Sequence, residues 1–445
     1  MNTTLVGSQF GDEGKGRMTD IFSEGADLVV RFQGGDNAGH TIATDGEEYS
    51  LRLVPSGVVR GKTGVIGNGC VVNFGTLFDE LDRLRERGLD PEVYVSGRAT
   101  VVLPYHRVLD GAEEQAREES ATAVGTTGNG IGPAYEDATG RRAIRVAELL
   151  DSETLRERLE HVVPQKRAIA ESVYGVDTGE AFDADALFEQ FRAYGRRLDR
   201  EGMVVDTGAF LAAHDGDVVF ESAQGTQLDL DHGSYPFVTS STPTAGGAIV
   251  GTGVPPETVA DGETIGVVKA YLSRVGAGPM PTEFEGETAT TLREAAGEFG
   301  TVTGRPRRVG WLDLPMLRHA TRVNGYTGIT LGHLDALATL DDLKVCTAYE
   351  LDGERLETPP PSADQWARCV PQYERFDSWD DRDWQKVADR GTEALPENAR
   401  SYTEFVSDDL GVPVYAVGVG PGREATIVRE NPVIEADAGA KRPKR

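Results

Sequence analysis

The sequence is poor in lysine and cysteine, and it has no long apolar run. Only 8 of its 45 basic residues are lysine, and the three cysteines at 70, 346 and 369 lie far apart without a CxxC pair. This spacing fits neither a disulfide framework nor a structural zinc site. No stretch approaches the roughly 18 apolar residues of a membrane-spanning helix, and the first residues do not resemble a signal peptide. We therefore expect a cytoplasmic protein with no membrane partner.

Basic charge is also scarce relative to acidic charge. The 445 residues include 73 acidic and 45 basic side chains, which gives a formal net charge of −28. Nucleic-acid binding needs a basic surface that displaces counterions, so this balance argues against a nucleic-acid partner. Dense carboxylates suit a halophilic protein in a high-salt cytoplasm. The alternative is an ordinary soluble surface with the arginine usage of a GC-rich genome.

Glycine is abundant, at 54 residues, and its runs follow predicted strands. Hydrophobic patterns predict strands at 4–6, 26–32, 218–220, 265–268, 328–331 and 412–417, and helices at 17–23, 76–88 and around 187–198. The second helix is expected to begin with a Thr-x-x-Asp cap at Thr76. This alternation predicts an α/β fold with a large, mostly parallel central sheet flanked by helices. We expect one domain over 1–434 and a frayed tail over 435–445.

The first glycine-rich segment, GSQFGDEGKGR at residues 7–17, joins the first predicted strand to the first predicted helix. Free N–H groups at a helix N-terminus suit phosphate, and Lys15 adds a positive charge. The segment is not a Walker A sequence, because Gly16 stands where Ser or Thr would bind magnesium. Asp12 is then the candidate metal ligand or base in the loop. The alternative is an ordinary glycine-rich turn between a strand and a helix.

The second glycine-rich segment, RFQGGDNAGHT at residues 31–41, follows the second predicted strand. Ligands of parallel sheets bind at the carboxyl ends of the strands, so both segments are expected at one edge of the sheet. His40 ordinarily titrates near neutrality and suits acid or base chemistry, although a lone histidine is more often structural. Paired with Asp12, it would place a base and an acid beside one phosphoryl group.

The segments GDEGKGR and QGGDNAGHT together resemble the signature of adenylosuccinate synthetases. The similarity runs from Thr4 to Arg423, and further segments follow in the family's order: GTTGNGIGPAYED at 125–137, ESAQG at 221–225, DHGSYPFVTSS at 231–241, TAGG at 244–247, KAYLSRVGAGP at 269–279 and TGRPRRVGW at 303–311. An ordered series is far more specific than any one segment. The resemblance implies a P-loop-like GTP-binding ligase fold. It also implies GTP-dependent ligation of IMP and L-aspartate to adenylosuccinate, with release of GDP and phosphate, as the first committed step of AMP biosynthesis.

The resemblance also implies roles for individual residues. Asp12 is the base that takes the N1 proton of IMP, His40 is the acid, and the reaction passes through 6-phosphoryl-IMP. One Mg²⁺ per subunit is implied on the Asp12 carboxylate and the Gly39 carbonyl. The chain is implied to act as a homodimer in which Arg141 reaches the neighbouring subunit's site.

The binding residues implied by the resemblance form three sets. Those for GTP are Gly11, Glu13, Gly14, Lys15, Gly16, Arg17, Gly39, Thr41, Arg307, His333, Leu334, Asp335, Gly418, Val419 and Gly420. Those for IMP are Asn37, Thr127, Arg141, Gln224, Thr239 and Arg305. Those for aspartate are Thr301, Val302, Thr303, Gly304, Arg305 and Arg307. From the residues alone, Thr127 and Thr239 also fit ordinary turns, and the arginines at 305–308 also fit a solvated run.

Guanine recognition is where the sequence departs most from the family. Asp335 can accept hydrogen bonds from the N1–H and amino groups of guanine, which adenine does not offer. His333, however, replaces the family's lysine, Gly418 its frequent serine and Arg17 its lysine. These changes bear on the choice of GTP over ATP and remove no proposed catalytic group. Two rival classes are disfavoured: a P-loop-type nucleotide kinase, by the missing Walker A serine or threonine and the extra arginines, and a regulatory GTP-binding module, by the presence of Asp12, His40 and Arg305.

Overall fold

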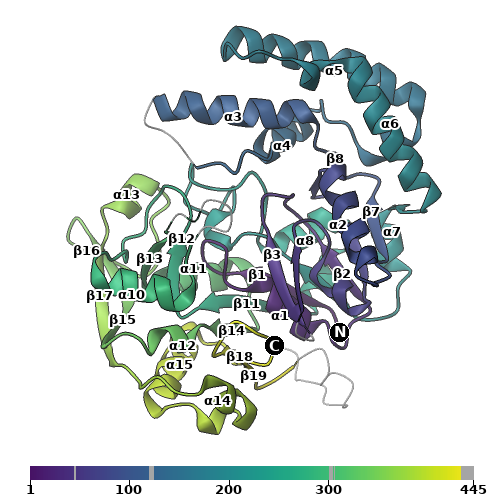
Figure 1. The fold of residues 1–445 in the computed structure, drawn as a ribbon. Helices are drawn as coiled ribbons and strands as arrows, with labels where there is room; N and C mark the ends of the chain where they lie inside the picture. The colour runs from purple at the N-terminus through teal and green to yellow at the C-terminus, as the bar shows by residue number, and fades with distance from the viewer. Residues whose placement is uncertain (45–46, 120–124, 300–303, 305, 432–445) are drawn as a thin grey trace.

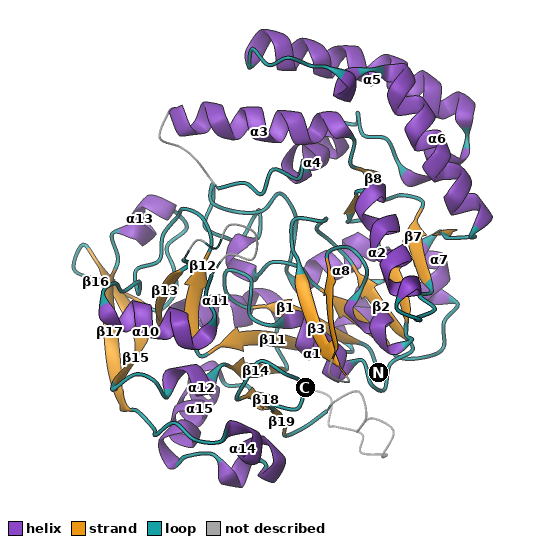
Figure 2. Cartoon of the chain, viewed as in Figure 1, coloured by secondary structure: helices purple, strands orange, loops and turns teal. Residues whose placement is uncertain are grey.

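The chain forms an α/β fold around a ten-stranded central sheet (Figures 1 and 2). The computed structural model describes residues 1–44, 47–119, 125–299, 304 and 306–431. The strand order is β19-β18-β14-β11-β1-β10-β2-β5-β7-β9, and all neighbouring pairs are parallel except the edge pair β18 and β19. The strands are β1 (Thr3–Gly7), β2 (Leu28–Arg31), β5 (Thr63–Ile66), β7 (Val93–Ser96), β9 (Val204–Val205), β10 (Val218–Glu221), β11 (Glu263–Lys269), β14 (Gly328–Gly332), β18 (Val414–Gly418) and β19 (Thr426–Val428).

A second, five-stranded sheet lies at one side of the molecule (Figure 1). It contains β12 (Tyr271–Arg274), β13 (Arg308–Asp313), β15 (Asp342–Leu351), β16 (Glu354–Leu356) and β17 (Val370–Asp377). Two small pairs complete the strands: β3 (His40–Thr44) with β4 (Glu47–Leu51), and β6 (Val71–Val72) with β8 (Thr100–Val101). Since β12 follows β11 after one residue, the second sheet begins beside the carboxyl end of a central strand.

Helices surround the central sheet, and α3, α5 and α6 lie together along the side shown at the top of Figure 1. The α-helices are α1 (Lys15–Phe22), α2 (Phe74–Glu86), α3 (Pro104–Glu119), α4 (Ile131–Thr139), α5 (Ser152–Val173), α6 (Ala184–Arg200), α7 (Thr207–Ala212), α8 (Ala245–Thr252), α9 (Pro256–Ala260), α10 (Glu287–Ala296), α11 (Leu314–Asn324), α12 (Leu334–Leu337), α13 (Ala363–Ala367), α14 (Trp384–Arg390) and α15 (Glu397–Leu410). The 3-10 helices are η1 (Ser56–Arg60), η2 (Val146–Leu150), η3 (Glu180–Phe182), η4 (Thr226–Leu228) and η5 (Thr392–Ala394). None of the helices in the described ranges is long and apolar enough to cross a bilayer.

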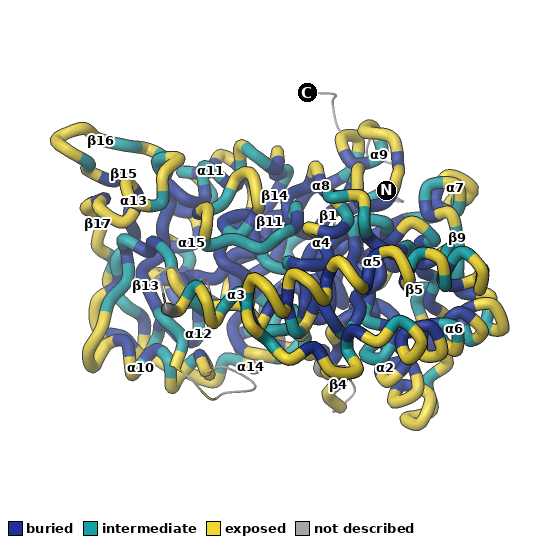
Figure 3. The backbone as a smooth tube through the Cα atoms, turned by 90° about the horizontal axis from the view of Figure 1, so that it is seen from above, coloured by how far each residue is buried: buried dark blue, intermediate teal, exposed yellow. Residues whose placement is uncertain are grey.

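The central strands are buried on both faces because helices cover both (Figure 3). Successive side chains of a strand point to opposite faces of the sheet. In β1, Leu5 joins the core cluster that contains Met18 of α1, whereas Val6 joins the cluster that contains Ala248 of α8. This two-sided burial explains why the central strands read as continuous apolar runs. The packing of α1 on the sheet also fixes the position of the first glycine-rich segment, which joins β1 to α1.

The predicted strands and helices of the sequence are confirmed, with one wrong helix start. The N-cap of α2 is Asn73, whose Oδ1 accepts hydrogen bonds from the N–H groups of Gly75 at 3.1 Å and Thr76 at 3.4 Å. Thr76 does not cap the helix, because its hydroxyl donates to Asp36 at 2.8 Å. The second sheet was not expected from the sequence. The single domain over 1–434 stays a prediction, and the tail at 435–445 lies outside the described residues.

Candidate active site

The loop between β1 and α1 folds around its own carboxylate. Glu13, which is 1% exposed, accepts hydrogen bonds at Oε1 from the N–H groups of Gln9 at 2.9 Å and Gly11 at 3.0 Å. Lys15 Nζ lies 2.7 Å from Glu13 Oε2. Gly11 and Gly14 have φ of 85° and 86°, which glycine adopts without strain. Two backbone N–H groups and an ammonium thus converge on one anionic group just before the N-terminus of α1, an arrangement that resembles phosphate-binding loops.

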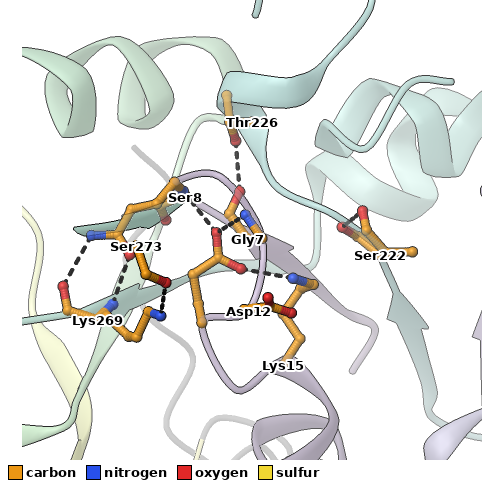
Figure 4. Close-up of polar contacts among 12 residues, drawn as sticks. Gly7, Ser8, Asp12, Lys15, Ser222, Thr226, Lys269 and Ser273 are labelled. Atoms are coloured by element: carbon orange, nitrogen blue, oxygen red, sulfur yellow. Dashed lines mark hydrogen bonds and ion pairs between the residues drawn. The ribbon is translucent and has the colours of Figure 1, made fainter. Parts of the chain in front are cut away.

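Asp12 lies on the outside of this loop, where Figure 4 shows it near Lys15. Its carboxylate is 44% exposed and lies 3.1 Å from Arg307 Nη2. Arg307 Nη1 is bound at 2.8 Å to Glu298, which also accepts from Lys269 Nζ at 2.6 Å. Burial would raise the pKa of Glu298, but Lys269 and Arg307 outweigh it and lower the pKa to about 2. A buried ionic network therefore holds an arginine against Asp12.

His40 begins β3 and packs on the first turn of α1. A Cβ added to Gly16 would lie 3.2 Å from the Cβ of His40, so any larger residue at 16 would press on the histidine. Burial is the main cause that lowers the pKa of His40 to about 4, and Lys15 adds to the effect. The imidazole is therefore neutral at pH 7. Its Nε2 is buried and has no hydrogen-bond partner in the described part of the chain, so one ring nitrogen is available to a ligand.

Two residues assigned to IMP meet beside the second glycine-rich segment. Asn37 Oδ1 accepts hydrogen bonds from the N–H of Gly35 and from Gln224 Nε2, both at 3.4 Å. Gln224 has a φ of 56°, and its buried Oε1 finds no partner within the described ranges. Tyr135 OH accepts from the N–H of Gly34 at 2.9 Å and fixes this segment. An unpartnered side-chain oxygen on a residue with a strained backbone is suited to accept a hydrogen bond from a ligand.

The structure describes only some of the other residues assigned to IMP and aspartate. Thr127 accepts a hydrogen bond from Asn129 at 3.2 Å, and the N–H of Thr239 donates to Leu228 at 2.8 Å. Arg141 follows α4 and is exposed, with a φ of 60°. Gly304 is exposed with a φ of 63°. Thr301, Val302, Thr303 and Arg305 lie outside the described residues.

The residues assigned to the base lie where β14 and β18 end. His333 has a φ of 65°, and its ring centroid lies 5.8 Å from that of Tyr271. Burial is the main cause that lowers the pKa of His333 to about 3. Asp335 carries a buried Oδ1 without a partner among the described residues, and burial raises its pKa. The remaining assigned residues are Leu334 and Val419, both buried, Gly418 and Gly420 at the end of β18, and the exposed Gly39 and Thr41.

The sequence assignments missed Glu298, Lys269 and Arg31. Arg31 Nη2 donates to the carbonyl of Gly35 at 2.7 Å and thereby supports the second glycine-rich segment. An acidic residue at 298 carries no signal in a chain with 73 of them. Lysine is different. Only 8 occur, yet Lys15, Lys166 and Lys269 are buried, so the scarcity of lysine itself could have pointed to Lys269.

The oxygen donors at this site fit a magnesium ion that arrives with a nucleotide. The described ranges contain no group of three or more His, Cys, Asp or Glu side chains that could hold a metal ion. Mg²⁺ commonly uses only one or two carboxylates and takes further ligands from phosphates and water. Asp12, exposed beside the loop, is such a carboxylate.

The fold and this site define a nucleotide-dependent α/β enzyme, with a phosphate-binding type of loop at the carboxyl end of a central parallel strand. A sequence model of the family described as adenylosuccinate synthetase matches residues 4–427. The chain is 59% identical to the adenylosuccinate synthetase of Natronomonas pharaonis and 58% identical to that of Haloarcula marismortui, over 97% of this chain and 100% of each relative. Its fold matches that of the fully ligated adenylosuccinate synthetase from Plasmodium falciparum with a TM-score of 0.89 at 34% identity, over 96% of this chain and 100% of that one.

The chain belongs to the adenylosuccinate synthetase family. It is thus a ligase of the purine pathway that forms a C–N bond, and the family's reaction is the GTP-dependent ligation of IMP and L-aspartate.

Proposed function

We propose that Asp12 and His40 carry the phosphoryl-transfer half of the family's reaction in this chain. Asp12 takes the N1 proton of IMP, the 6-oxygen attacks the γ-phosphorus of GTP, and GDP leaves. Lys15 and the N–H groups of the loop meet the charge that develops on the transferred phosphoryl oxygens. The observation that carries this proposal is that Asp12 and Lys15 flank one loop while His40 packs on the first turn of the helix that follows it.

The second half of the reaction displaces the new phosphate. The amine of L-aspartate attacks C6 of 6-phosphoryl-IMP, the C6–O bond breaks, and inorganic phosphate leaves. Arg307 and residues 301–305 are proposed to bind the carboxylates of L-aspartate, because a guanidinium fork matches a carboxylate. The contacts of Arg307 with Asp12 and Glu298 support this role, since they orient the fork before the substrate arrives.

The purine substrates are proposed to lie on either side of the loop. For GTP, Asp335 accepts hydrogen bonds from guanine, and the backbone N–H groups of the loop together with Lys15 hold the phosphates. For IMP, the site consists of Asn37, Gln224, Thr127, Thr239 and Arg305, with Arg141 supplied by the other subunit of a homodimer. Asp12 and the Gly39 carbonyl would hold one Mg²⁺, whose charge balances that of the phosphates. We place the reaction in the cytoplasm, where these nucleotide substrates are drawn from common pools.

One assay tests the proposal. The full-length chain is incubated with IMP, L-aspartate, Mg²⁺ and GTP at low and high salt, and adenylosuccinate is followed by absorbance. We expect Asp12→Ala and His40→Ala each to abolish turnover while circular dichroism stays unchanged. The exposed residues Asp199 and His161 provide matched controls, because Asp199→Ala and His161→Ala should leave kcat unchanged. Near-normal kcat in either site variant removes that residue from its role.

A further inference from the structure

Arg17 extends its side chain from the first turn of α1 to the ends of β14 and β18. Its Nη1 donates to the carbonyl of Gly420. A Cβ on Gly332 would lie 3.3 Å from Arg17 Nη2, and a Cβ on Gly418 would lie 2.7 Å from the same atom. A Cβ on Gly14 would lie 3.8 Å from the same atom, so the guanidinium lies between the first glycine-rich loop and the segment that carries Asp335.

Two of the three nitrogens of this guanidinium make no hydrogen bond within the described residues. Arg17 is only 9% exposed, and its Nε and Nη2 have no hydrogen-bond partner in the described part of the chain. A buried, charged donor without a partner is costly, so native structures leave one unpaired mainly where a ligand will bind. The unpartnered atoms thus indicate a ligand acceptor at this position.

Asp335 follows Gly332 by three residues and also has an unused hydrogen-bonding atom. Its Oδ1 is buried and unpartnered within the described ranges. Burial lowers the pKa of Arg17, and the nearby charge of Asp335 opposes that shift, so the two groups are within electrostatic reach of each other. An unpartnered donor on Arg17 and an unpartnered acceptor on Asp335, within electrostatic reach of each other, are suited to one ligand group that binds both.

We propose that Arg17 is a specificity-determining residue that reads O6 of guanine while Asp335 reads the N1–H and amino group beside it. This inference rests on the proposed function, since it concerns the base of the GTP bound there. Guanine presents one acceptor and two donors in sequence along a single edge, which matches a cation next to an anion. Adenine presents a donor at C6 and an acceptor at N1, so it mismatches both side chains. Arg17 thereby joins Asp335 in the choice of nucleotide.

Gly418 is the partner that makes this position of Arg17 possible. Any side chain at 418 would begin 2.7 Å from Arg17 Nη2 and 3.1 Å from the Cα of Gly332. The far end of an arginine moves easily, so a residue at 418 would displace the guanidinium more than it would unfold the protein. Arg17 and Gly418 therefore form a matched pair.

The test compares nucleotides across four full-length proteins: wild type, Arg17→Met, Gly418→Ser and the double variant Arg17→Lys/Gly418→Ser. We measure kcat/KM for GTP, ITP and ATP. A charge-assisted hydrogen bond is worth about 1.5–3 kcal/mol, so Arg17→Met should lower kcat/KM for GTP and ITP by about tenfold to hundredfold. The value for ATP should stay constant or rise. Gly418→Ser should act in the same direction, and the double variant should recover part of the GTP/ATP ratio. Arg322→Met, at an exposed position of α11, is the control.

Two outcomes overturn the inference: an equal loss for all three nucleotides, which would assign Arg17 to the phosphates, or an unchanged GTP/ATP ratio in both single variants. Calorimetric titration with GDP and ADP, without IMP or aspartate, separates this inference from the proposed function. If ligation fails but Arg17→Met still weakens GDP and not ADP, the base contact stands and the reaction is wrong. If Arg17→Met does not fold, Gly418→Ser alone decides.

Discussion

The guanidinium of Arg307 lies 3.1 Å from the carboxylate of Asp12. The residue proposed to bind aspartate and the residue proposed to take the proton from IMP are therefore paired with each other before either meets its substrate. Under the proposed roles, a carboxylate of L-aspartate and the carboxylate of Asp12 would compete for the same guanidinium.

Glu298 should control the contact between Arg307 and Asp12. Glu298→Gln removes the anchor of Arg307 and leaves the ammonium of Lys269, 1% exposed, without its anion. Breaking a buried ion pair costs about 3–5 kcal/mol, so the free energy of unfolding in urea should fall by that order. KM for L-aspartate should rise as Arg307 loses its orientation. Glu294→Gln, at an exposed position of α10, should change neither quantity. Equal stability of the two variants would contradict the network.

Acid should destabilise the protein before most carboxylates titrate. Burial is the first cause that lowers the pKa of His40 to about 4 and that of His333 to about 3, against an ordinary value of 6.5. Below pH 6.5 the unfolded chain binds protons that the native chain does not, so stability is present above that pH and is lost as pH falls towards 4. His106 and His319 share this direction.

Thermal unfolding between about pH 7 and pH 4 measures this effect. The double variant His40→Gln/His333→Gln should lose less stability over the interval than wild type. His161→Gln, at an exposed position, should follow the wild-type curve. Parallel curves for wild type and the double variant would refute the buried, neutral state of both rings.

Mixed dimers test whether Arg141 serves the neighbouring subunit. Arg141→Ala and Asp12→Ala chains should each be nearly inactive alone. In an equal mixture half the dimers are mixed, and each mixed dimer has one site with both residues, so about a quarter of wild-type activity should return. Co-expression with two affinity tags gives both numbers: the unfractionated mixture should show about a quarter of wild-type activity, and the doubly tagged fraction, which holds only mixed dimers, about half. A mixture that stays inactive would place Arg141 in its own subunit's site.

Salt should raise both stability and activity. At a net charge of −28, carboxylates repel one another in dilute buffer, and molar salt shortens the range of that repulsion to about 3 Å. The relatives from Natronomonas pharaonis and Haloarcula marismortui, at 59% and 58% identity, are halophilic archaeal proteins and support this expectation. Melting temperature and kcat are measured from dilute buffer to molar KCl. Maximal activity in dilute buffer, lost in molar KCl, would contradict it.

The central sheet and its loops were predictable because their signals are local. An apolar run that passes into a glycine-rich segment and then into an amphipathic helix identifies β1, the loop and α1 in about 20 consecutive residues. The cap of α2 was missed because Asn73 and Thr76 both satisfy capping rules, and only the contact with Asp36 decides between them. The pattern of one segment does not contain that choice.

Other features were unpredictable because they depend on residues far apart in the chain. Glu298 gains its importance from Lys269 and Arg307, and no spacing rule links an acidic residue to partners supplied by other elements. The direction of the Glu13 side chain was also unpredictable from the sequence. Its sequence position suggests an exposed loop acid, whereas the backbone N–H groups of the loop draw it inward.

The hydrogen bond from Arg17 to Gly420 spans 403 positions of the chain. During translation the phosphate loop leaves the ribosome first, whereas the end of β18 emerges only after nearly all other elements have been made. Because β1 itself pairs with β10 and β11, the loop that follows it also waits for distant parts of the chain. Under the proposed role of Arg17, a polypeptide that lacks β18 should not tell one purine nucleotide from another.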